Sequence, residues 1–302
     1  MYRALKAVSR MLTGGRPVPA TAARHGPVLA WPPGHFYSPI PSLDEVRRRE
    51  ATLFGPAPRT IPGLDLDETG QLECFAAMAP YYPEQPFAAT PQPKLRFHFD
   101  NPNFAAGDGI ILYCLLRHVR PARVIEIGSG YSSAALLDVN ERHFDNAIAC
   151  TFVEPYPALL ESLLRPGDRE RIRIHPHPVQ DVGREVFEPL RPGDVLVVDS
   201  THVLKTGSDV NTILFEILPA LASGVYIHFH DVFYPFEYPR EWAYQERAWN
   251  EVYALRAFLQ YNDAFEIVYF NHFFALFHAE RLRAAMPLCA TTPGSGLWLR
   301  KR

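Results

Sequence analysis

The chain has 302 residues, of which 47% are hydrophobic and 21% charged, and its formal net charge is −3. This length allows one large or two ordinary domains with a buried core. The lack of a dense Lys/Arg run argues against nucleic acid as a partner, and no apolar run reaches the roughly 18 residues of a membrane span. Four distant cysteines without CxxC spacing are typical of reduced thiols, so we expect a cytoplasmic protein.

Residues 1–95 are rich in proline, glycine and aromatic side chains. We expect them to form an N-terminal extension that packs as a lid on a catalytic domain at 96–302. The first 12 residues alternate basic and apolar side chains, which is compatible with a short helix or a frayed tail. Residues 34–38 could line a ligand site or merely pack, and the sequence leaves both options open.

Two helices are predicted within the extension, at 43–53 and at about 68–81. Ser42 precedes the first of them, and Glu45 follows three residues later, the spacing of a capping box. The alternating order of strands and helices begins further on, after a predicted helix that starts near residue 104 and ends near Pro121.

A strand, a glycine turn and a helix follow one another at residues 124–137. Val124, Ile125 and Ile127 form the apolar strand, Gly128-Ser129-Gly130 the turn, and Ser132 and Ser133 open a run of small helix-forming residues. Glycine allows a tight turn and close approach to a ligand, and the helix N-terminus offers free N–H groups and a positive dipole end. This pattern indicates a cradle for a nucleotide or cofactor.

Apolar strands then alternate with helices, which indicates a parallel sheet covered on both faces. The predicted strands are 124–127, 148–153, 171–175, 194–198 and 224–229, and the predicted helices 157–164, 181–190 and 209–222. A long helix at 241–261 and two further strands, at 264–271 and 297–301, close the chain, with a short helix at 277–284 between the strands. We therefore expect a doubly wound, mostly parallel α/β sheet with an antiparallel edge.

Polar residues follow the ends of these strands, where open α/β sheets bind ligands. Glu154 stands 26 positions after Gly128 and could accept hydrogen bonds from ribose hydroxyls. Gln180 and Asp181 follow the third strand and could meet an adenine amine. After the fourth and fifth strands come the residues Asp199, Ser200, Thr201, His202, His230 and Asp231.

Each of these residues also has a structural interpretation. Glu154 could cap the next helix, and Asp199 could cap a turn. We expect His228 to point to the opposite face of the sheet from His230 and to be a satisfied core histidine. The functional interpretation is favoured because four strand ends carry suitable polar groups in order.

At these motifs the sequence resembles the class I S-adenosylmethionine (SAM)-dependent methyltransferases. Val-Ile-Glu-Ile-Gly-Ser-Gly-Tyr-Ser-Ser resembles their first motif, Phe-Val-Glu-Pro the second, and Asp-Val-Leu-Val-Val-Asp-Ser-Thr-His the fourth. The resemblance covers about residues 104–302 and implies a Rossmann-like seven-stranded sheet whose last strand is antiparallel. The cofactor-binding residues that it implies are Glu126, Gly128, Ser129, Gly130, Ser132, Ser133, Glu154, Gln180, Asp181 and Asp199.

Within that class, the region from the fourth to the fifth strand is similar to metal-dependent, catechol-type O-methyltransferases. Their metal ligands match Asp199, His230 and Asp231, with His in place of an acid and Asp in place of Asn. Mg²⁺ prefers oxygen ligands and imidazole suits other metals, so the divalent cation could be retained, changed or lost. His202 stands where that family has its catalytic Lys.

The resemblance implies methylation of a hydroxyl on a small molecule or sugar. A histidine can remove a hydroxyl proton near neutral pH, so His202 or His230 is the expected general base, oriented by Asp199 or Asp231. The aromatic, proline-rich segment 232–239 is the expected wall of the acceptor site.

Three other functions remain open at this stage. The first is an NAD-dependent oxidoreductase, although Ser133 replaces the third glycine of GxGxxG. The second is a non-haem metal enzyme using His228, His230 and Asp231, and the third is an inactive SAM-binding module. The oligomeric state is open too, with a homodimer among the options.

Overall fold

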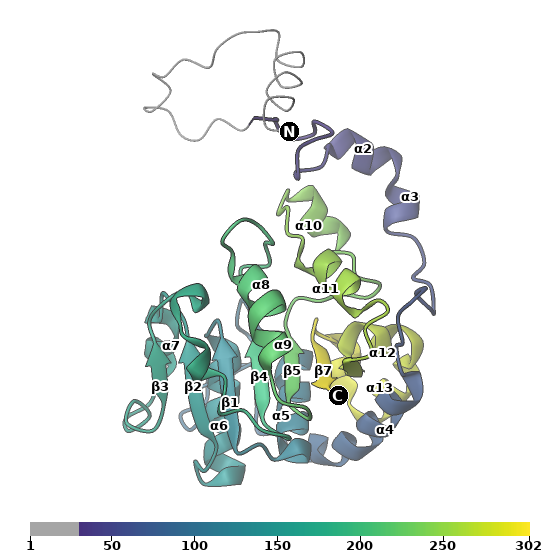
Figure 1. Cartoon of the computed structure of the whole chain (residues 1–302). Coiled ribbons are helices and arrows are strands. Elements are labelled where there is room, and N and C mark those ends of the chain that lie inside the picture. The colour runs from purple at the N-terminus through teal and green to yellow at the C-terminus, as the bar shows by residue number, and fades with distance from the viewer. Residues whose placement is uncertain (1–29) are drawn as a thin grey trace, which may run out of the picture. The chain divides into compact units, whose positions relative to one another are not determined.

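The computed structural model describes residues 30–302 (Figure 1), so the prediction for the first 12 residues lies outside the described part. The chain divides into two compact units after Arg48. The first contains α2 (Leu43–Arg48), where the Glu45 N–H donates to Ser42 Oγ at 3.4 Å. The second begins with α3 (Glu50–Leu53), so the helix expected over 43–53 is interrupted. The expected boundary at residue 95 and the lid role of residues 34–38 stay predictions.

All seven strands form where the sequence predicts them. They are β1 (Arg123–Ile127), β2 (Ala149–Val153), β3 (Arg173–His175), β4 (Val195–Val198), β5 (Tyr226–Phe229), β6 (Phe265–Phe270) and β7 (Leu297–Lys301). Their order in one sheet is β3-β2-β1-β4-β5-β7-β6. The expected antiparallel last strand is confirmed, but β7 lies between β5 and β6 and pairs antiparallel with both, instead of forming the edge.

Besides α3, the second unit contains further described helices, of which α6, α8 and α9 lie beside the sheet in Figure 1. Before β3 they are α4 (Glu68–Met78), η2 (Ala79–Glu84), α5 (Ala106–Val119), α6 (Tyr131–Phe144) and α7 (Ala158–Leu163). After β3 they are η3 (Val179–Asp181), η4 (Arg184–Val186), α8 (Asp209–Thr212), the π-helical η5 (Ile213–Ile217), α9 (Leu218–Ala220), α10 (Arg240–Tyr244), α11 (Glu251–Leu259), α12 (Asn271–Phe277), α13 (Ala279–Ala285) and α14 (Pro287–Thr291).

Two helix predictions are wrong. Residues 181–190 contain only short 3-10 turns on either side of Gly183. The helix expected over 241–261 is split into α10 and α11 by a linker in which Glu246 and Ala248 adopt left-handed backbone angles. The backbone N–H of Glu251 donates to the carbonyl of His202 at 3.1 Å, so a contact with a distant loop sets the start of α11.

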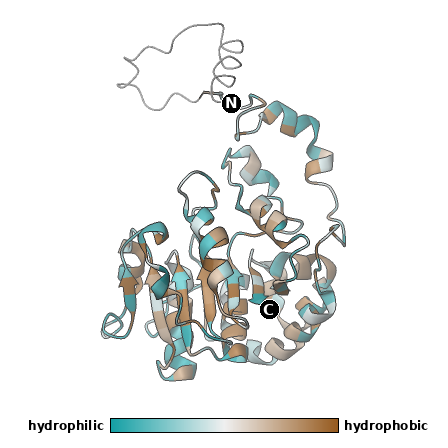
Figure 2. Ribbon diagram, in the orientation of Figure 1, coloured by the Kyte–Doolittle hydropathy of each residue, from teal (hydrophilic) through white to brown (hydrophobic). Residues whose placement is uncertain are grey.

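Alternate residues of the central strands pack into two hydrophobic cores, one on each face of the sheet. In β4, Leu196 and Val198 belong to the core that contains α8, η5 and α11. Val195 and Val197 belong to the core that contains α5 and α6. Figure 2 shows these central strands as hydrophobic. The sheet is thus covered on both faces, as a continuous apolar strand requires.

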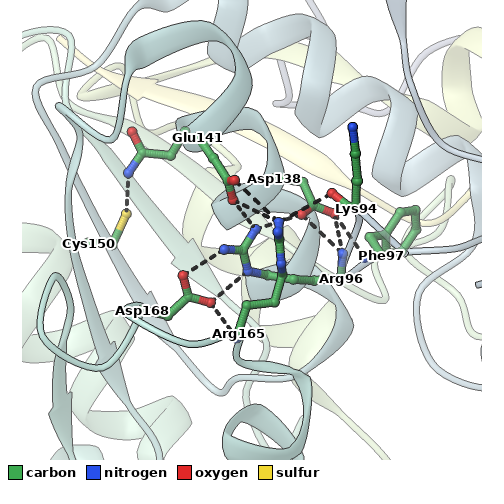
Figure 3. Close-up of polar contacts among 9 residues, drawn as sticks. Lys94, Arg96, Phe97, Asp138, Glu141, Cys150, Arg165 and Asp168 are labelled. Carbon is green, nitrogen blue, oxygen red and sulfur yellow. Dashed lines mark hydrogen bonds and ion pairs between the residues drawn. The ribbon is translucent and has the colours of Figure 1, made fainter. Parts of the chain in front are cut away.

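A buried ion-pair network holds α6 in place (Figure 3). The Arg96 guanidinium, only 2% exposed, lies 2.8 Å from Asp138 and 2.6 Å from Asp168, and it contacts Glu141 at 2.8 Å. Asp138 also accepts the backbone N–H groups of Arg96 and Phe97 at 2.9 Å. The segment before α5 is thereby tied to α6, the helix that follows the glycine turn.

The Arg96→Met substitution should lower the free energy of unfolding by about 3–5 kcal/mol, because it leaves buried carboxylates unpaired. The matched control is Arg184→Met, which removes an exposed pair with Glu216 and should cost less than about 1 kcal/mol. Urea unfolding of both variants measures the difference. Equal losses of unfolding free energy in the two variants would mean that the Arg96 network contributes no more to stability than an exposed ion pair.

Among residues 30–302, no helix combines the length and apolar character needed to cross a membrane. All four cysteines are free thiols; three are buried, and Cys74 is half-buried.

Candidate functional site

The glycine turn brings the ends of β1 and β4 into direct contact. The Asp199 N–H donates to the carbonyl of Ile127 at 2.8 Å. Gly128 has a φ of +79°, and a Cβ there would lie 2.0 Å from the Asp199 carbonyl oxygen. Glycine is required at this position for both reasons, and its presence sets Asp199 beside the turn.

Buried polar side chains form hydrogen bonds that support the glycine turn. Ser133 Oγ donates to Glu126 at 2.5 Å and accepts the Gly130 N–H at 3.0 Å. Burial raises the pKa of Glu126 to about 8, against the opposing hydrogen bonds from Ser132 and Ser133. These three side chains support the turn, and direct contact between them and a cofactor stays a prediction.

Glu154 joins the turn to the segment before α7. Its carboxylate accepts the Ser129 N–H at 3.1 Å and the Tyr156 N–H at 2.7 Å. It also lines a cavity of about 350 Å³ together with Gly128, Gln180 and Asp199. The structural and the ligand-binding interpretations of Glu154 are therefore compatible.

Gln180 and Asp181 differ in their relation to this cavity. Gln180 lines it and donates a hydrogen bond to the Gly207 carbonyl at 2.9 Å. Asp181 is exposed and does not line it. The structure thus brings together the predicted residues from four strand ends, without Asp181.

His202 is buried and lies among several acids after the end of β4. Its Nδ1 is 2.8 Å from Glu251 Oε2, and its Nε2 is 3.4 Å from Asp199 and 3.7 Å from Asp231. Both His202 and Asp231 have positive φ angles, 60° and 57°. Left-handed backbone is costly for such residues and is concentrated at functional sites.

His230, at the end of β5, faces the same two aspartates. Its Nδ1 is 3.4 Å from Asp199 and 3.8 Å from Asp231, and its Nε2 is 3.6 Å from Asp108. Asp199 therefore lies between the two imidazoles. The predicted residues Asp199, His202, His230 and Asp231 form a single cluster, which we call the strand-end cluster.

The acids hold both histidines in the protonated form. Burial alone would lower the pKa of His202, but the hydrogen bonds with Asp199 and Glu251 outweigh it and raise that pKa to about 10. Burial opposes protonation of His230 as well, and the charges of Asp199 and Asp231 nevertheless raise its pKa well above the ordinary value. Burial acts to raise the pKa of Asp199, but the charge of His230 and the hydrogen bond from His202 lower it overall.

Three further residues complete the cluster and were not identified from the sequence. Glu251 bonds His202, Asp108 faces His230, and Ser295 Oγ donates to Asp231 at 2.9 Å. The sequence pattern could have identified Glu251 as a buried acid, since it lies four residues before Leu255 on the buried stripe of α11. Asp108, in the first turn of α5, has the pattern of an ordinary helix-start acid.

The expectations for His228 are wrong on two points. Side chains two residues apart in a strand share a face, and the rings of His228 and His230 lie 6.4 Å apart. His228 packs on Trp298, with ring centroids 4.5 Å apart, and neither of its nitrogens has a hydrogen-bond partner among the described residues. Burial, the largest effect, lowers the pKa of His228 to about 3, so it is a neutral core histidine.

The strand-end cluster does not fit the metal site of the catechol-type enzymes. Within residues 30–302, no group of three or more His, Cys, Asp or Glu side chains is arranged to hold a metal ion. The imidazole nitrogens are paired with carboxylate oxygens, and Mg²⁺ prefers an octahedron of oxygen ligands. A metal at Asp199, His230 and Asp231 stays a prediction that this geometry does not support.

A second cavity, of about 790 Å³, lies next to the cluster. His230 and Asp231 line it, as do Phe233, Tyr234 and Tyr238 of the segment after β5. His202 lines neither this cavity nor the smaller one. The strand-end cluster therefore contributes to both walls, with Asp199 in the small cavity at the glycine turn and His230 and Asp231 in the larger one.

Residues 125–232 match the family model of a methyltransferase domain. An uncharacterized protein of Archaeoglobus fulgidus is 36% identical over 165 residues, which cover 53% of this chain and 73% of that protein. The chain therefore carries a methyltransferase domain in the region that holds the class I SAM-dependent motifs. The resemblance seen in the sequence is thus confirmed, as is the sheet that it implies.

Two solved methyltransferase structures are similar at low identity. The SAH-bound Podospora anserina methyltransferase PaMTH1 is 15% identical, with a TM-score of 0.43 and coverage of 86% of this chain and 96% of that one. The Streptomyces achromogenes O-methyltransferase TomG, in complex with SAM, is 16% identical, with a TM-score of 0.43 and coverage of 85% and 95%. Because both scores are below 0.5, the assignment of the methyltransferase domain rests on the other findings.

The pairing of His202 with Glu251 predicts a pH-dependent contribution to stability. A histidine whose pKa rises on folding stabilises the protein fully below its unfolded pKa of about 6.5, and loses that effect as pH rises through its folded pKa. Glu251→Gln should therefore cost about 3–5 kcal/mol at pH 6, and the cost should shrink as pH rises through about 10. Urea unfolding across this range measures it, and a cost that does not change with pH would contradict the ion pair.

Proposed function

We propose that this chain is an O-methyltransferase that transfers the methyl group of SAM to a hydroxyl of a small molecule held in the larger cavity. The observation that carries the proposal is that one cluster of charged side chains contributes lining residues to two cavities. Asp199 lines the smaller one, and His230 and Asp231 line the larger one. The methyltransferase domain supplies the reaction class.

The smaller cavity is suited to an adenosine-containing donor. Glu154 offers carboxylate oxygens to ribose hydroxyls, Gln180 offers an amide to a base, and the turn at Gly128 precedes the N-terminus of the 14-residue helix α6. When bound, SAM supplies a methyl group already activated by the sulfonium. The protein's part is then to align donor and acceptor and to deprotonate the acceptor.

The larger cavity receives the acceptor hydroxyl beside Asp231 and His230. A general base must accept a proton, and His202 and His230 are already protonated at neutral pH. We therefore assign the base to the Asp231 carboxylate, in place of the histidine expected from the sequence. Asp231 would accept the O–H proton, and bound SAM would supply its methyl group to the acceptor oxygen and leave as the neutral thioether S-adenosylhomocysteine.

The histidines have an electrostatic role in this scheme. The His230 imidazolium lies beside the position where negative charge develops on the acceptor oxygen, and preorganised charge there lowers the barrier. His202 lies behind the cluster, held by Glu251, and orients Asp199 and Asp231. His202 is a positioning residue in this account.

Glu154→Ala should weaken SAM binding by about 1–3 kcal/mol, the scale of a lost hydrogen bond to a charged group. Isothermal titration calorimetry with SAM measures the change. Glu161→Ala, an exposed acid of the neighbouring α7 that lies outside the cavity, is the control and should bind like the wild type. Unchanged affinity in Glu154→Ala would remove Glu154 from the donor site.

Asp231→Asn should lower the rate of methyl transfer about 10²–10⁴-fold, the contribution of a general base, and leave SAM affinity nearly unchanged. The assay follows labelled methyl transfer from SAM to a hydroxylated acceptor that the wild type accepts. Asp181→Asn is the matched control, since Asp181 is exposed and outside both cavities. A nearly normal rate in Asp231→Asn would exclude Asp231 as the base.

A further inference from the structure

Resting on the proposed function, we infer that the acceptor is a large, uncharged and mainly apolar molecule that presents a single hydroxyl at one end. The cavity of about 790 Å³ falls in the upper half of the roughly 300–1,000 Å³ range of small-molecule sites. A single phenol ring or a monosaccharide would leave most of this volume unfilled. The size therefore favours a multi-ring or long-chain acceptor.

The wall of the cavity is dominated by aromatic side chains. These are Phe54, Phe104, Phe233, Tyr234, Tyr238 and Trp242. They come from the segment after α3, the segment before α5, the segment after β5, and α10, which contains Trp242. Aromatic faces contribute large apolar contact areas and favour stacking on flat rings.

Two polar side chains in this wall, Asn101 and His272, are hydrogen-bonded within the protein. The amide of Asn101 donates to the carbonyls of His98 and Phe104, and its oxygen accepts the N–H groups of Asn103 and Phe104. The ring of His272 is bonded to the Tyr234 backbone at 3.0 Å. A sugar would bury several hydroxyl groups against such a wall without partners, at a cost for each group.

The charges at the cavity disfavour an anionic acceptor. Arg240 is the one arginine in the wall, which has no lysine among the described residues, and its guanidinium is paired with Glu50 at 2.8 Å. Glu237 and Glu241 also line the cavity and would repel a phosphate or carboxylate. His230 is the remaining cationic group in the wall, and three aspartates face it.

The polar groups of the strand-end cluster that line the cavity lie together, since His230 is 3.6 Å from Asp108 and 3.8 Å from Asp231, and Ser295 donates to Asp231. An acceptor with one hydroxyl can place it there and keep the rest of its surface on the aromatic walls. The geometry thus fits an apolar body with a single polar end.

A fluorescence titration with hydroxypyrene tests this inference, with its trisulfonated analogue as the matched anionic probe. Hydroxypyrene should bind at least about 100-fold more tightly than the trisulfonate, whose charges meet no unpaired cation. Leu276 of α12 lines the cavity and is 46% exposed. Leu276→Glu should weaken hydroxypyrene binding about 10-fold, through the charge placed in an apolar wall.

Leu288→Glu is the control, because Leu288 is 39% exposed and lies outside the cavity. It should change the affinity for hydroxypyrene less than about 2-fold. Equal binding of the two probes, or equal affinities of the Leu276→Glu and Leu288→Glu variants, would overturn the inference. The titration needs no SAM, so calorimetry that shows no SAM binding would count against the proposed function alone.

Discussion

The site depends on the ion pairs that Asp199 makes with His202 and His230. Asp199 follows β4, His230 follows β5, and His202 lies in the loop after β4. Opposite charges at 3.4 Å join the loop after β4 to the end of β5. Both imidazoles are buried, and Coulomb interactions are stronger there than in water. The same contacts place Asp199 in the wall of the smaller cavity and His230 in the wall of the larger one.

Burying several charges carries a desolvation cost, which is offset only if each group has good partners. The strand-end cluster meets this condition through residues on distant elements, namely Glu251 on α11, Asp108 on α5 and Ser295 before β7. The positive φ angles of His202 and Asp231 add a further cost. Such a cluster is costly to assemble, and its residues line both cavities. A role in a reaction explains it better than a contribution to stability.

The sequence predicted the sheet well because each strand is a short apolar run of a kind that needs little tertiary information. It also predicted that Glu154, Asp199, His202, His230 and Asp231 would meet, since parallel strands end at the same edge of the sheet. It could not predict the break between α10 and α11, because that break depends on hydrogen bonds from the α11 N-terminus to His202. The sequence could not predict that both histidines are protonated, because their partners Glu251 and Asp108 lie on distant elements.

The ring-nitrogen ¹⁵N NMR spectrum of the histidines is the most direct test of the strand-end cluster, with signals assigned by their loss in His202→Gln and His230→Gln. Because of their acidic partners, we expect His202 and His230 to carry protons on both ring nitrogens at about pH 8, where an ordinary histidine is neutral. A neutral imidazole at either position at that pH would show that the acids do not keep this histidine protonated. That histidine would then be the better candidate for the general base.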